Sequence, residues 1–128
     1  REGGARPGIS LDPAVPVDSV RALLPHVERA CLMAVSPGFA GQKLVPGTME
    51  KIAELAAEIQ RRGLRVQIEV DGNVSWENIP GMIAAGADIL VAGSSSLFEE
   101  PRNLEGNLRR LYGLIGRDPA PEGARRAR

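Results

Sequence analysis

The stretch VQIEVDGNVSWENIPGMIAAGADILVAGS, residues 66–94, decides the fold class of this chain. It begins with an apolar run over Val66–Val70 and ends with a second run, almost wholly apolar, over Ile89–Ala92. Between them, Ile79–Ala85 has the composition of a short helix that Gly86 would close. A strand, a helix and a second strand in succession predict two parallel strands joined by a helical crossover.

The same alternation extends toward the N-terminus. Apolar runs over Ile9–Leu11 and Cys31–Val35 predict two further strands. A helix is expected after the first of them, beginning with Asp18 as its N-cap and running through Leu24. After the second strand, the spacing predicts a helix over residues 49–62 that stops at Gly63.

Helical periodicity is clearest in two segments. The helix that ends near Gly63 has an apolar face formed by Met49, Ile52, Ala53, Ala56 and Ile59. Its charged residues fall mostly on the other faces, namely Glu50, Lys51, Glu58, Arg61 and Arg62. The last helix is predicted from the apolar spacing of Leu104, Leu108, Leu111, Tyr112 and Ile115.

Four strand-then-helix units predict an α/β fold with a parallel sheet. Strands that are apolar on both faces are typical of such sheets. Two architectures satisfy this pattern: a small open doubly wound sheet, or half of a (β/α)8 barrel, whose whole needs ~200–250 residues. Periodicity alone does not separate them.

Composition supports one small globular domain and excludes several functions. The chain has 128 residues, 43% of them apolar and 3% aromatic, with 16 basic and 16 acidic side chains. A surface for nucleic acid or for anionic membranes would need a basic excess, which this balance lacks. Cys31 is the only cysteine, which excludes an internal disulfide and a multi-cysteine metal site. With no apolar run long enough for a membrane helix and no visible signal peptide, we expect a cytoplasmic protein.

The two ends differ from the rest of the chain. The sequence opens at Arg1 instead of a methionine, so we expect either a processed start or a piece of something longer. Residues 117–128 are rich in Pro, Gly, Ala and Arg and lack an apolar period. We therefore expect one folded domain over residues 1–116, followed by a disordered tail.

In parallel α/β folds the functional groups gather beyond the carboxyl ends of the strands. Three of the four expected strand ends are rich in glycine, at residues 36–42, 71–73 and 93–96. Glycine lets backbone N–H groups approach an anion closely, so these loops are candidates for phosphate binding. Ordinary βα turns have a similar composition and remain the alternative.

Asp71 is the strongest catalytic candidate, because a carboxylate at a strand end can bind a metal or move a proton. Its alternative role is to form a turn or cap a helix. We expect only a turn at Asp12, and a surface position for His26. Met33 lies within a predicted strand and either lines a site or fills the core.

Four motifs follow one another in order: ISLDPA at 9–14, LMAVSPGFAGQ at 32–42, IEVDGN at 68–73 and AGADILVAGS at 85–94. Together they resemble the C-terminal half of the ribulose-phosphate 3-epimerase family over nearly all of residues 4–115. The resemblance implies a (β/α)8 TIM barrel, of which this chain holds parallel strands five to eight. It also implies interconversion of ribulose 5-phosphate and xylulose 5-phosphate by inversion at C3.

The resemblance also implies roles for residues. In this family one aspartate removes the C3 proton, a second returns it on the opposite face, and a divalent metal (Zn, Fe, Mn or Co) stabilises the enediolate. Asp71 matches the metal-ligating acid/base aspartate of strand seven, and Met33 matches a methionine that faces the metal site. The residues that match the loop closing over the substrate are Gly38, Phe39, Ala40 and Gly41. The residues that match the phosphate-binding loops are Gly72, Asn73, Gly93 and Ser94.

Two departures from the family shape the prediction. Glycines are usual where Ala40 and Asn73 stand, and relatives acting on other ketose phosphates, such as allulose 6-phosphate, vary in these loops. A serine, two metal-binding histidines and the second catalytic aspartate belong to the first four family strands, and none is in this chain. We therefore expect a truncated epimerase-like enzyme that is inactive alone.

The sequence leaves a choice of partners and of functional class. The missing N-terminal half is expected to be encoded upstream or on a partner, and the sheet edges of a half-barrel favour association, including homo-oligomers. One alternative is a non-catalytic half-barrel that binds phosphorylated ligands or self-associates. Another is a flavodoxin-like binding domain, which would leave the ordered motifs unexplained.

Overall fold

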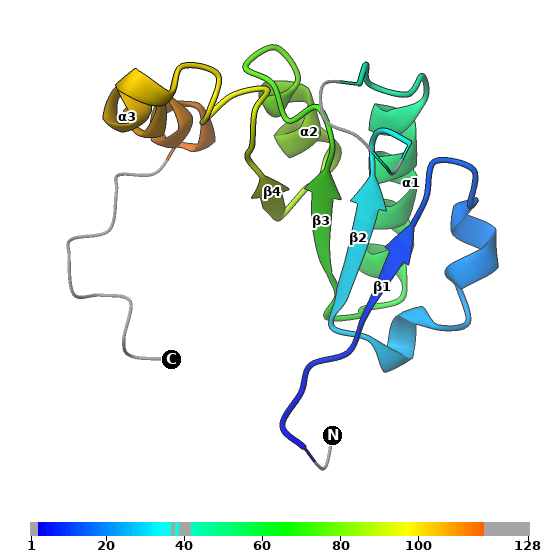
Figure 1. Cartoon of the computed structure of the whole chain (residues 1–128). Helices are drawn as coiled ribbons and strands as arrows, with labels where there is room; N and C mark the ends of the chain where they lie inside the picture. The colour runs from blue at the N-terminus through cyan, green and yellow to red at the C-terminus, as the bar shows by residue number, and fades with distance from the viewer. Residues whose placement is uncertain (1–2, 37, 39–41, 117–128) are drawn as a thin grey trace.

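A computed structural model describes residues 3–36, 38 and 42–116. These residues form a parallel sheet in the sequential order β1-β2-β3-β4 (Figure 1). The strands are β1 (Gly8–Leu11), β2 (Arg29–Met33), β3 (Gln67–Asp71) and β4 (Ile89–Val91). The predicted parallel pairing is confirmed throughout. The tail predicted over residues 117–128 lies outside the described residues.

Three α-helices follow the last three strands. They are α1 (Thr48–Arg61), α2 (Ile79–Ala85) and α3 (Leu104–Ile115). All three were predicted, and α1 ends as expected before Gly63, which has a φ of +64°. In the described part of the chain, no helix has both the length and the apolar character needed to cross a membrane.

The α-helix predicted from Asp18 was wrong. The segment after β1 instead forms two short 3₁₀ turns, η1 (Val17–Val20) and η2 (Leu24–His26). Pro25 lacks a backbone N–H and disfavours helical geometry at Leu24, which limits the helix at its predicted end but does not by itself explain the 3₁₀ form of Val17–Val20. Asp18 lies inside η1 and does not cap it; its carboxylate accepts a hydrogen bond from Arg21.

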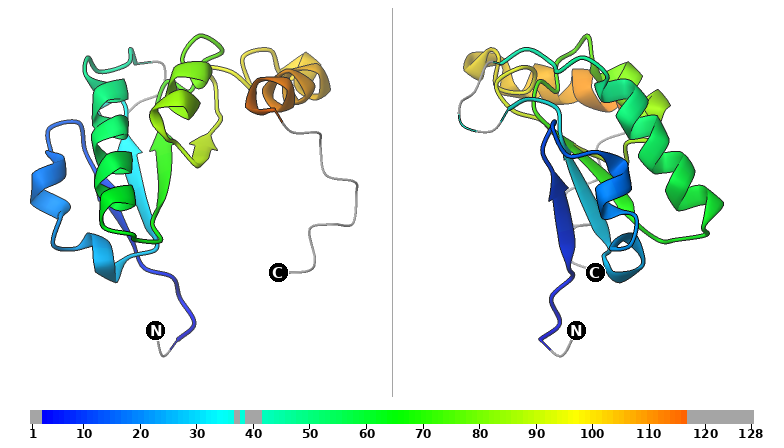
Figure 2. Two further views of the ribbon diagram at one scale, coloured as in Figure 1. Left: turned by 180° about the vertical axis from the view of Figure 1, so that it is seen from behind. Right: turned by 90° about the vertical axis from the view of Figure 1, so that its right-hand side faces the viewer.

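The two faces of the sheet differ sharply. One face is buried beneath α1 and α2, which lie on the same side of the sheet (Figure 2). The core on this side comprises, from the strands, Leu11, Ala30, Leu32, Ile68 and Val70, and from the helices Ile52, Leu55, Ile59, Ile79 and Met82. The opposite face carries Ser10, Cys31, Met33, Glu69, Asp71 and Val91, all half-buried or exposed. No helix within the described ranges covers that face.

The strand order decides between the two architectures that periodicity left open. A doubly wound sheet reverses its strand order and carries helices on both faces. A (β/α)8 barrel keeps strands in sequential order and places every helix on the outside. The sequential order and the one-sided helices found here agree with part of a TIM barrel, whose inner surface would be the uncovered face.

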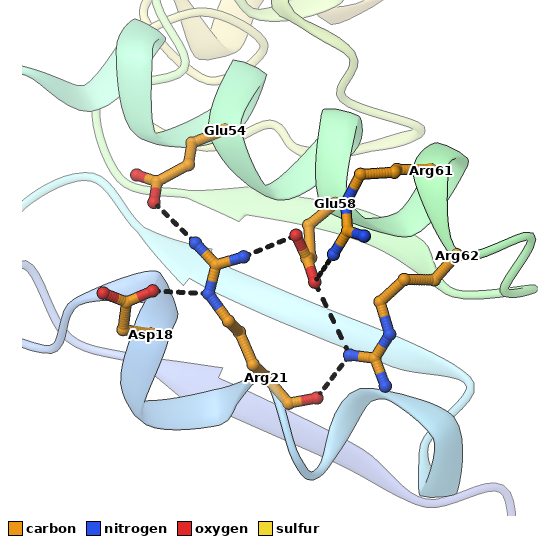
Figure 3. Close-up of polar contacts among 6 residues, drawn as sticks. All are labelled: Asp18, Arg21, Glu54, Glu58, Arg61 and Arg62. Carbon is orange, nitrogen blue, oxygen red and sulfur yellow. Dashed lines mark hydrogen bonds and ion pairs between the residues drawn. The ribbon is translucent and has the colours of Figure 1, made fainter.

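One face of α1 also differs from the prediction. Glu58 was expected among the exposed charged residues but is only 6% exposed, whereas Ala53 is exposed. The Glu58 carboxylate accepts hydrogen bonds from Arg21 Nη1 at 2.5 Å and Arg61 Nη2 at 2.8 Å, and Arg62 lies within ion-pair distance (Figure 3). Arg21 is the residue that caps η1, so this short turn covers a face of α1 that helical periodicity alone would leave in solvent.

Candidate functional site

The carboxyl ends of β2, β3 and β4 surround a pocket of about 370 Å³. Its lining includes seven of the residues predicted for the site, namely Met33, Gly38, Asp71, Gly72, Asn73, Gly93 and Ser94. The remaining predictions, Phe39, Ala40 and Gly41, lie outside the described residues. The structure thus brings together, at one end of the sheet, groups that are 60 or more positions apart in the sequence.

Asp71 is the last residue of β3 and is paired in register with Met33 on one side and Val91 on the other. Its side chain therefore shares the uncovered face of the sheet with theirs, because neighbouring residues of paired parallel strands point the same way. Its backbone carbonyl accepts a hydrogen bond of 2.7 Å from Ala34 N, which fixes the strand end. Asp71 is the one carboxylate that lines the pocket among the described residues.

This donor set does not fit a divalent metal by itself. Divalent ions in proteins take four to eight ligands, with several side chains usually contributing. Nowhere in residues 3–36, 38 and 42–116 do three or more His, Cys, Asp or Glu side chains come close enough to hold an ion. A metal at Asp71 would need further protein ligands from outside the described residues.

Gly72 fixes the backbone directly after Asp71. Its φ is +108°, a backbone conformation that residues other than glycine rarely adopt. A Cβ added here would lie 2.6 Å from Val35 Cγ2 and 3.0 Å from Val35 N. The loops after β2 and β3 therefore pack so closely that only glycine fits, which explains this residue in the IEVDGN motif.

Asn73 has an unusual backbone conformation for a residue other than glycine. Its φ is +45°, in the left-handed region that Asn tolerates better than most residues. Its side-chain amide donates to the Gln42 carbonyl at 3.1 Å, and its own carbonyl accepts from Asn78 Nδ2 at 3.1 Å. The side chain thus joins the loops after β2 and β3, which leaves the backbone N–H as the group it could offer an anion.

The loop after β4 presents small residues to the pocket. Gly93, Ser94 and Ser95 line it, and a Cβ on Gly93 would have no atom within 4 Å. The Gly93 carbonyl accepts hydrogen bonds from Ser96 N at 3.2 Å and Phe98 N at 3.0 Å, so the loop begins with a turn. Since no described Lys, Arg or His lines the pocket, an anion there would depend on backbone N–H groups and hydroxyls.

Cys31 lies on the same uncovered face, two residues before Met33. The pKa of its thiol is raised to about 12, mainly by burial and to a smaller extent by the neighbouring Glu69 carboxylate. Its Sγ lies 3.9 Å from Met33 Sδ. Because the thiolate is the reactive form of cysteine, a raised pKa disfavours a nucleophilic role for this residue at neutral pH.

Two further expectations about single residues are confirmed. Asp12 is exposed in a turn whose 2.9 Å hydrogen bond runs from Val15 N to the Asp12 carbonyl. His26 is exposed at the end of η2 and lines no part of the pocket.

Three polar residues of the pocket, Ser36, Gln42 and Ser95, lie in the loops that the sequence indicated but were not singled out there. Gln42 donates from Nε2 to the Ser36 carbonyl at 2.6 Å, so the two ends of the loop after β2 are linked. The rule that functional groups follow strand ends includes all three, but it does not say which residues of a loop face the pocket.

Comparisons with known proteins agree with this arrangement. A profile described as the ribulose-phosphate 3 epimerase family matches residues 1–98. Ribulose-phosphate 3-epimerase of Escherichia coli K12 is 38% identical over 101 residues, which cover 79% of this chain and 44% of that protein. The enzyme of the same name from Methanocaldococcus jannaschii is 41% identical over 92 residues, which cover 72% and 39%. The chain thus spans less than half the length of these curated relatives.

Proposed function

Because this chain belongs to the ribulose-phosphate 3-epimerase family, we propose that it supplies part of an active site that interconverts ribulose 5-phosphate and xylulose 5-phosphate. In this proposal β1 to β4 are strands five to eight of the barrel. One observation carries it: Asp71 and the glycine-rich loops after β3 and β4 line the same pocket. A carboxylate and an anion-binding rim are the two features that proton transfer on a sugar phosphate requires.

The chemistry follows from the weak acidity of the substrate. The proton at C3 lies next to the C2 carbonyl, and removing it moves the electron pair into an enediolate. We propose that the Asp71 carboxylate exchanges this proton on one face of C3. The loops at Gly72–Asn73 and Gly93–Ser94 hold the phosphate by backbone N–H groups, which keeps C3 at a fixed distance from Asp71.

Inversion needs a second proton donor on the opposite face of C3, since one carboxylate can serve only one face. The pocket offers no second carboxylate among the described residues, nor the ligands for a divalent metal. We therefore propose that the chain alone does not catalyse epimerisation. The second acid and any metal ligands would come from a complementary barrel half, which would cover the face that carries Cys31, Glu69 and Asp71.

The test is reconstitution with the part of the Escherichia coli epimerase that lies outside the matched 101 residues. The two pieces are co-expressed and purified together, and conversion of ribulose 5-phosphate to xylulose 5-phosphate is measured. We expect activity from the complex, none from this chain alone, and a loss of ~10²–10⁴-fold on Asp71→Asn, which is the usual contribution of a general base. Asp12→Asn is the control, since Asp12 is exposed and uses only its backbone carbonyl in the turn.

A complex that co-purifies but does not epimerise, or that keeps its activity with Asp71→Asn, would contradict the catalytic proposal. A second candidate function would then remain, that of a non-catalytic half-barrel that binds phosphorylated ligands. The pocket favours it in one respect, because a rim of N–H groups and hydroxyls can bind phosphate without a second carboxylate. Binding of ribulose 5-phosphate by a complex that never inverts C3 would support this candidate.

A further inference from the structure

Trp76 joins the two loops that form the anion-binding rim. It lies between β3 and α2, and its indole Nε1 donates to Glu99 Oε2 at 2.9 Å. Arg110 of α3 lies over the same ring, with Cζ 4.4 Å from the ring centroid. Trp76 is therefore connected both to the loop after β4 and to the helix that follows it.

The other attachments of the loop after β4 do not reach the loop after β3. Ser96 and Phe98 donate to Gly93 within the loop, and Asn107 of α3 donates from Nδ2 to the Leu97 carbonyl at 3.1 Å. Among the described residues, the hydrogen bond between Trp76 and Glu99 is the one that joins the side chains of the two loops. The pairing of Asp71 with Val91 fixes the start of the loop after β4, and this hydrogen bond holds the far part of the loop beside the loop after β3.

The same hydrogen bond holds the negative charge of Glu99 at a defined position. Trp76, Glu99 and Arg110 line a second pocket of about 500 Å³ beside the candidate site. The two pockets share Asn73 and Ser95, and Glu99 lines only the second. A free carboxylate next to an anion site would repel phosphate, so holding Glu99 in the second pocket favours binding in the first.

We propose that Trp76 is a positioning residue for the anion-binding loop at Gly93–Ser95. It holds the far part of that loop beside the loop after β3 and keeps the Glu99 carboxylate out of the site. This inference rests on the proposed function, because it requires that phosphate binds at this rim.

The test uses the 128-residue chain with inorganic phosphate as the probe. Trp76 is the only tryptophan, so its fluorescence reports on this contact alone, and the amide resonances of residues 93–95 report on the loop. Glu99→Ala removes the hydrogen-bond acceptor together with one negative charge. Glu99→Gln removes the charge but keeps an oxygen acceptor. Glu100→Ala is the matched control, since it removes the neighbouring negative charge of an exposed side chain without touching Trp76.

We expect Glu99→Ala to weaken phosphate binding about threefold, which is the modest effect of one exposed hydrogen bond. Glu99→Gln should restore most of that loss, and Glu100→Ala should leave binding equal or tighter, because it only removes repulsion. Trp76→Phe, which keeps the ring but loses the N–H, should match Glu99→Ala when binding is followed by NMR.

The outcomes separate this inference from the function on which it rests. If phosphate binds but Glu99→Ala binds it as tightly as Glu100→Ala does, the positioning role is wrong and the proposed function stands. If phosphate shifts neither the fluorescence nor the amide resonances of the unmodified chain, the phosphate site itself is wrong, and both proposals fall.

Discussion

Gly72 occupies the most crowded position of the candidate site. It stands between the proposed base Asp71 and Asn73, and its positive φ brings the loop after β3 against Val35. A side chain here would push apart two loops that both line the pocket. The geometry of Asp71 therefore depends on the absence of a neighbouring Cβ.

We expect Gly72→Ala to lower the free energy of unfolding by about 2–3 kcal/mol, from the strained backbone together with the clash. Chemical denaturation monitored by circular dichroism measures this change. Gly93→Ala is the control, because Gly93 has no positive φ and no atom within 4 Å of its missing Cβ. Equal effects of the two substitutions would show that the contact with Val35 does not restrict this position.

Cys31 yields a second prediction for a single residue. Folding raises the pKa of the Cys31 thiol from an ordinary value of 9.0 to about 12. Between these two pH values the folded protein keeps the thiol proton, whereas the unfolded chain loses it. Stability should therefore fall as the pH rises from 9 toward 12. At pH 8 we expect a thiol reagent to label folded Cys31 at least ~10-fold more slowly than the urea-unfolded chain. The folded protein holds much less thiolate, and the greater nucleophilicity of a thiolate with a raised pKa offsets this loss of rate only in part.

Comparable labelling rates in the folded and unfolded states would contradict the protection inferred for Cys31. Cys31→Ser provides the control for the pH dependence, since it keeps a small polar side chain that does not ionise. The fall in stability above pH 9 should be smaller in this variant.

For single residues, the sequence predicted where a residue lies along the strands and loops better than it predicted which residues contact one another. Asp71, Gly72, Gly93 and Ser94 could be placed at strand ends because apolar runs stop directly before them. The hydrogen bond from Asn73 to Gln42 could not, because it joins residues 31 positions apart. No local pattern encodes how closely two loops approach one another.

The helix α1 is attached to the segment after β1 by charged groups as well as by apolar packing. Glu58 is surrounded by Arg21, Arg61 and Arg62, and Arg62 also donates from Nη1 to the Arg21 carbonyl at 2.7 Å (Figure 3). Hydrogen bonds from Arg61 and then Arg21 lower the pKa of the Glu58 carboxyl, although burial opposes the shift. The charged form of Glu58 therefore stabilises the folded state.

The sign of this shift predicts how acid affects stability. A carboxyl whose pKa is lowered on folding contributes stability that is present above its ordinary value of 4.5 and is lost as the pH falls through the folded value. We expect Glu58→Gln to lower the melting temperature by several degrees at pH 7 and to reduce the loss of stability below pH 4.5. Glu54→Gln is the control, since Glu54 is 53% exposed and makes one long contact of 3.4 Å to Arg21. Similar melting temperatures for both variants would contradict a special role for Glu58.

Among the elements, helices with a clear period and a glycine stop were predictable. The predicted range of α2 agrees with the structure, the apolar residues that predicted the last helix all lie within α3, and Gly86 closes α2 with a φ of +120°. The segment with η1 and η2 was not predicted, because Val20, Leu23 and Leu24 have helical spacing and nothing in that spacing distinguishes short 3₁₀ turns from an α-helix. The burial of Glu58 could not be predicted either, because the same segment supplies Arg21, which covers it.

The whole molecule has one sheet face packed by helices and one uncovered. Val91 on β4 is 39% exposed, and β1 and β4 have no further strand beside them among the described residues. Unpaired strand edges and exposed apolar side chains promote association with another chain. The parallel pairing was a consequence of the strand-helix alternation, whereas the sequence pattern alone could not decide that α1 and α2 cover the same face.

We therefore expect the chain to self-associate with increasing concentration when no complementary barrel half is present, as measured by sedimentation velocity. Val91→Lys should weaken this association ~10-fold or more, because a charged edge strand resists pairing. Leu23→Lys is the matched control: Leu23 is 49% exposed, yet it lies between η1 and η2 on the helical side of the sheet. An equal loss of association in both variants would point to general hydrophobic adhesion. A chain that stays monomeric at all concentrations would mean that the uncovered face needs no partner, and the proposed requirement for a second half would lose its physical basis.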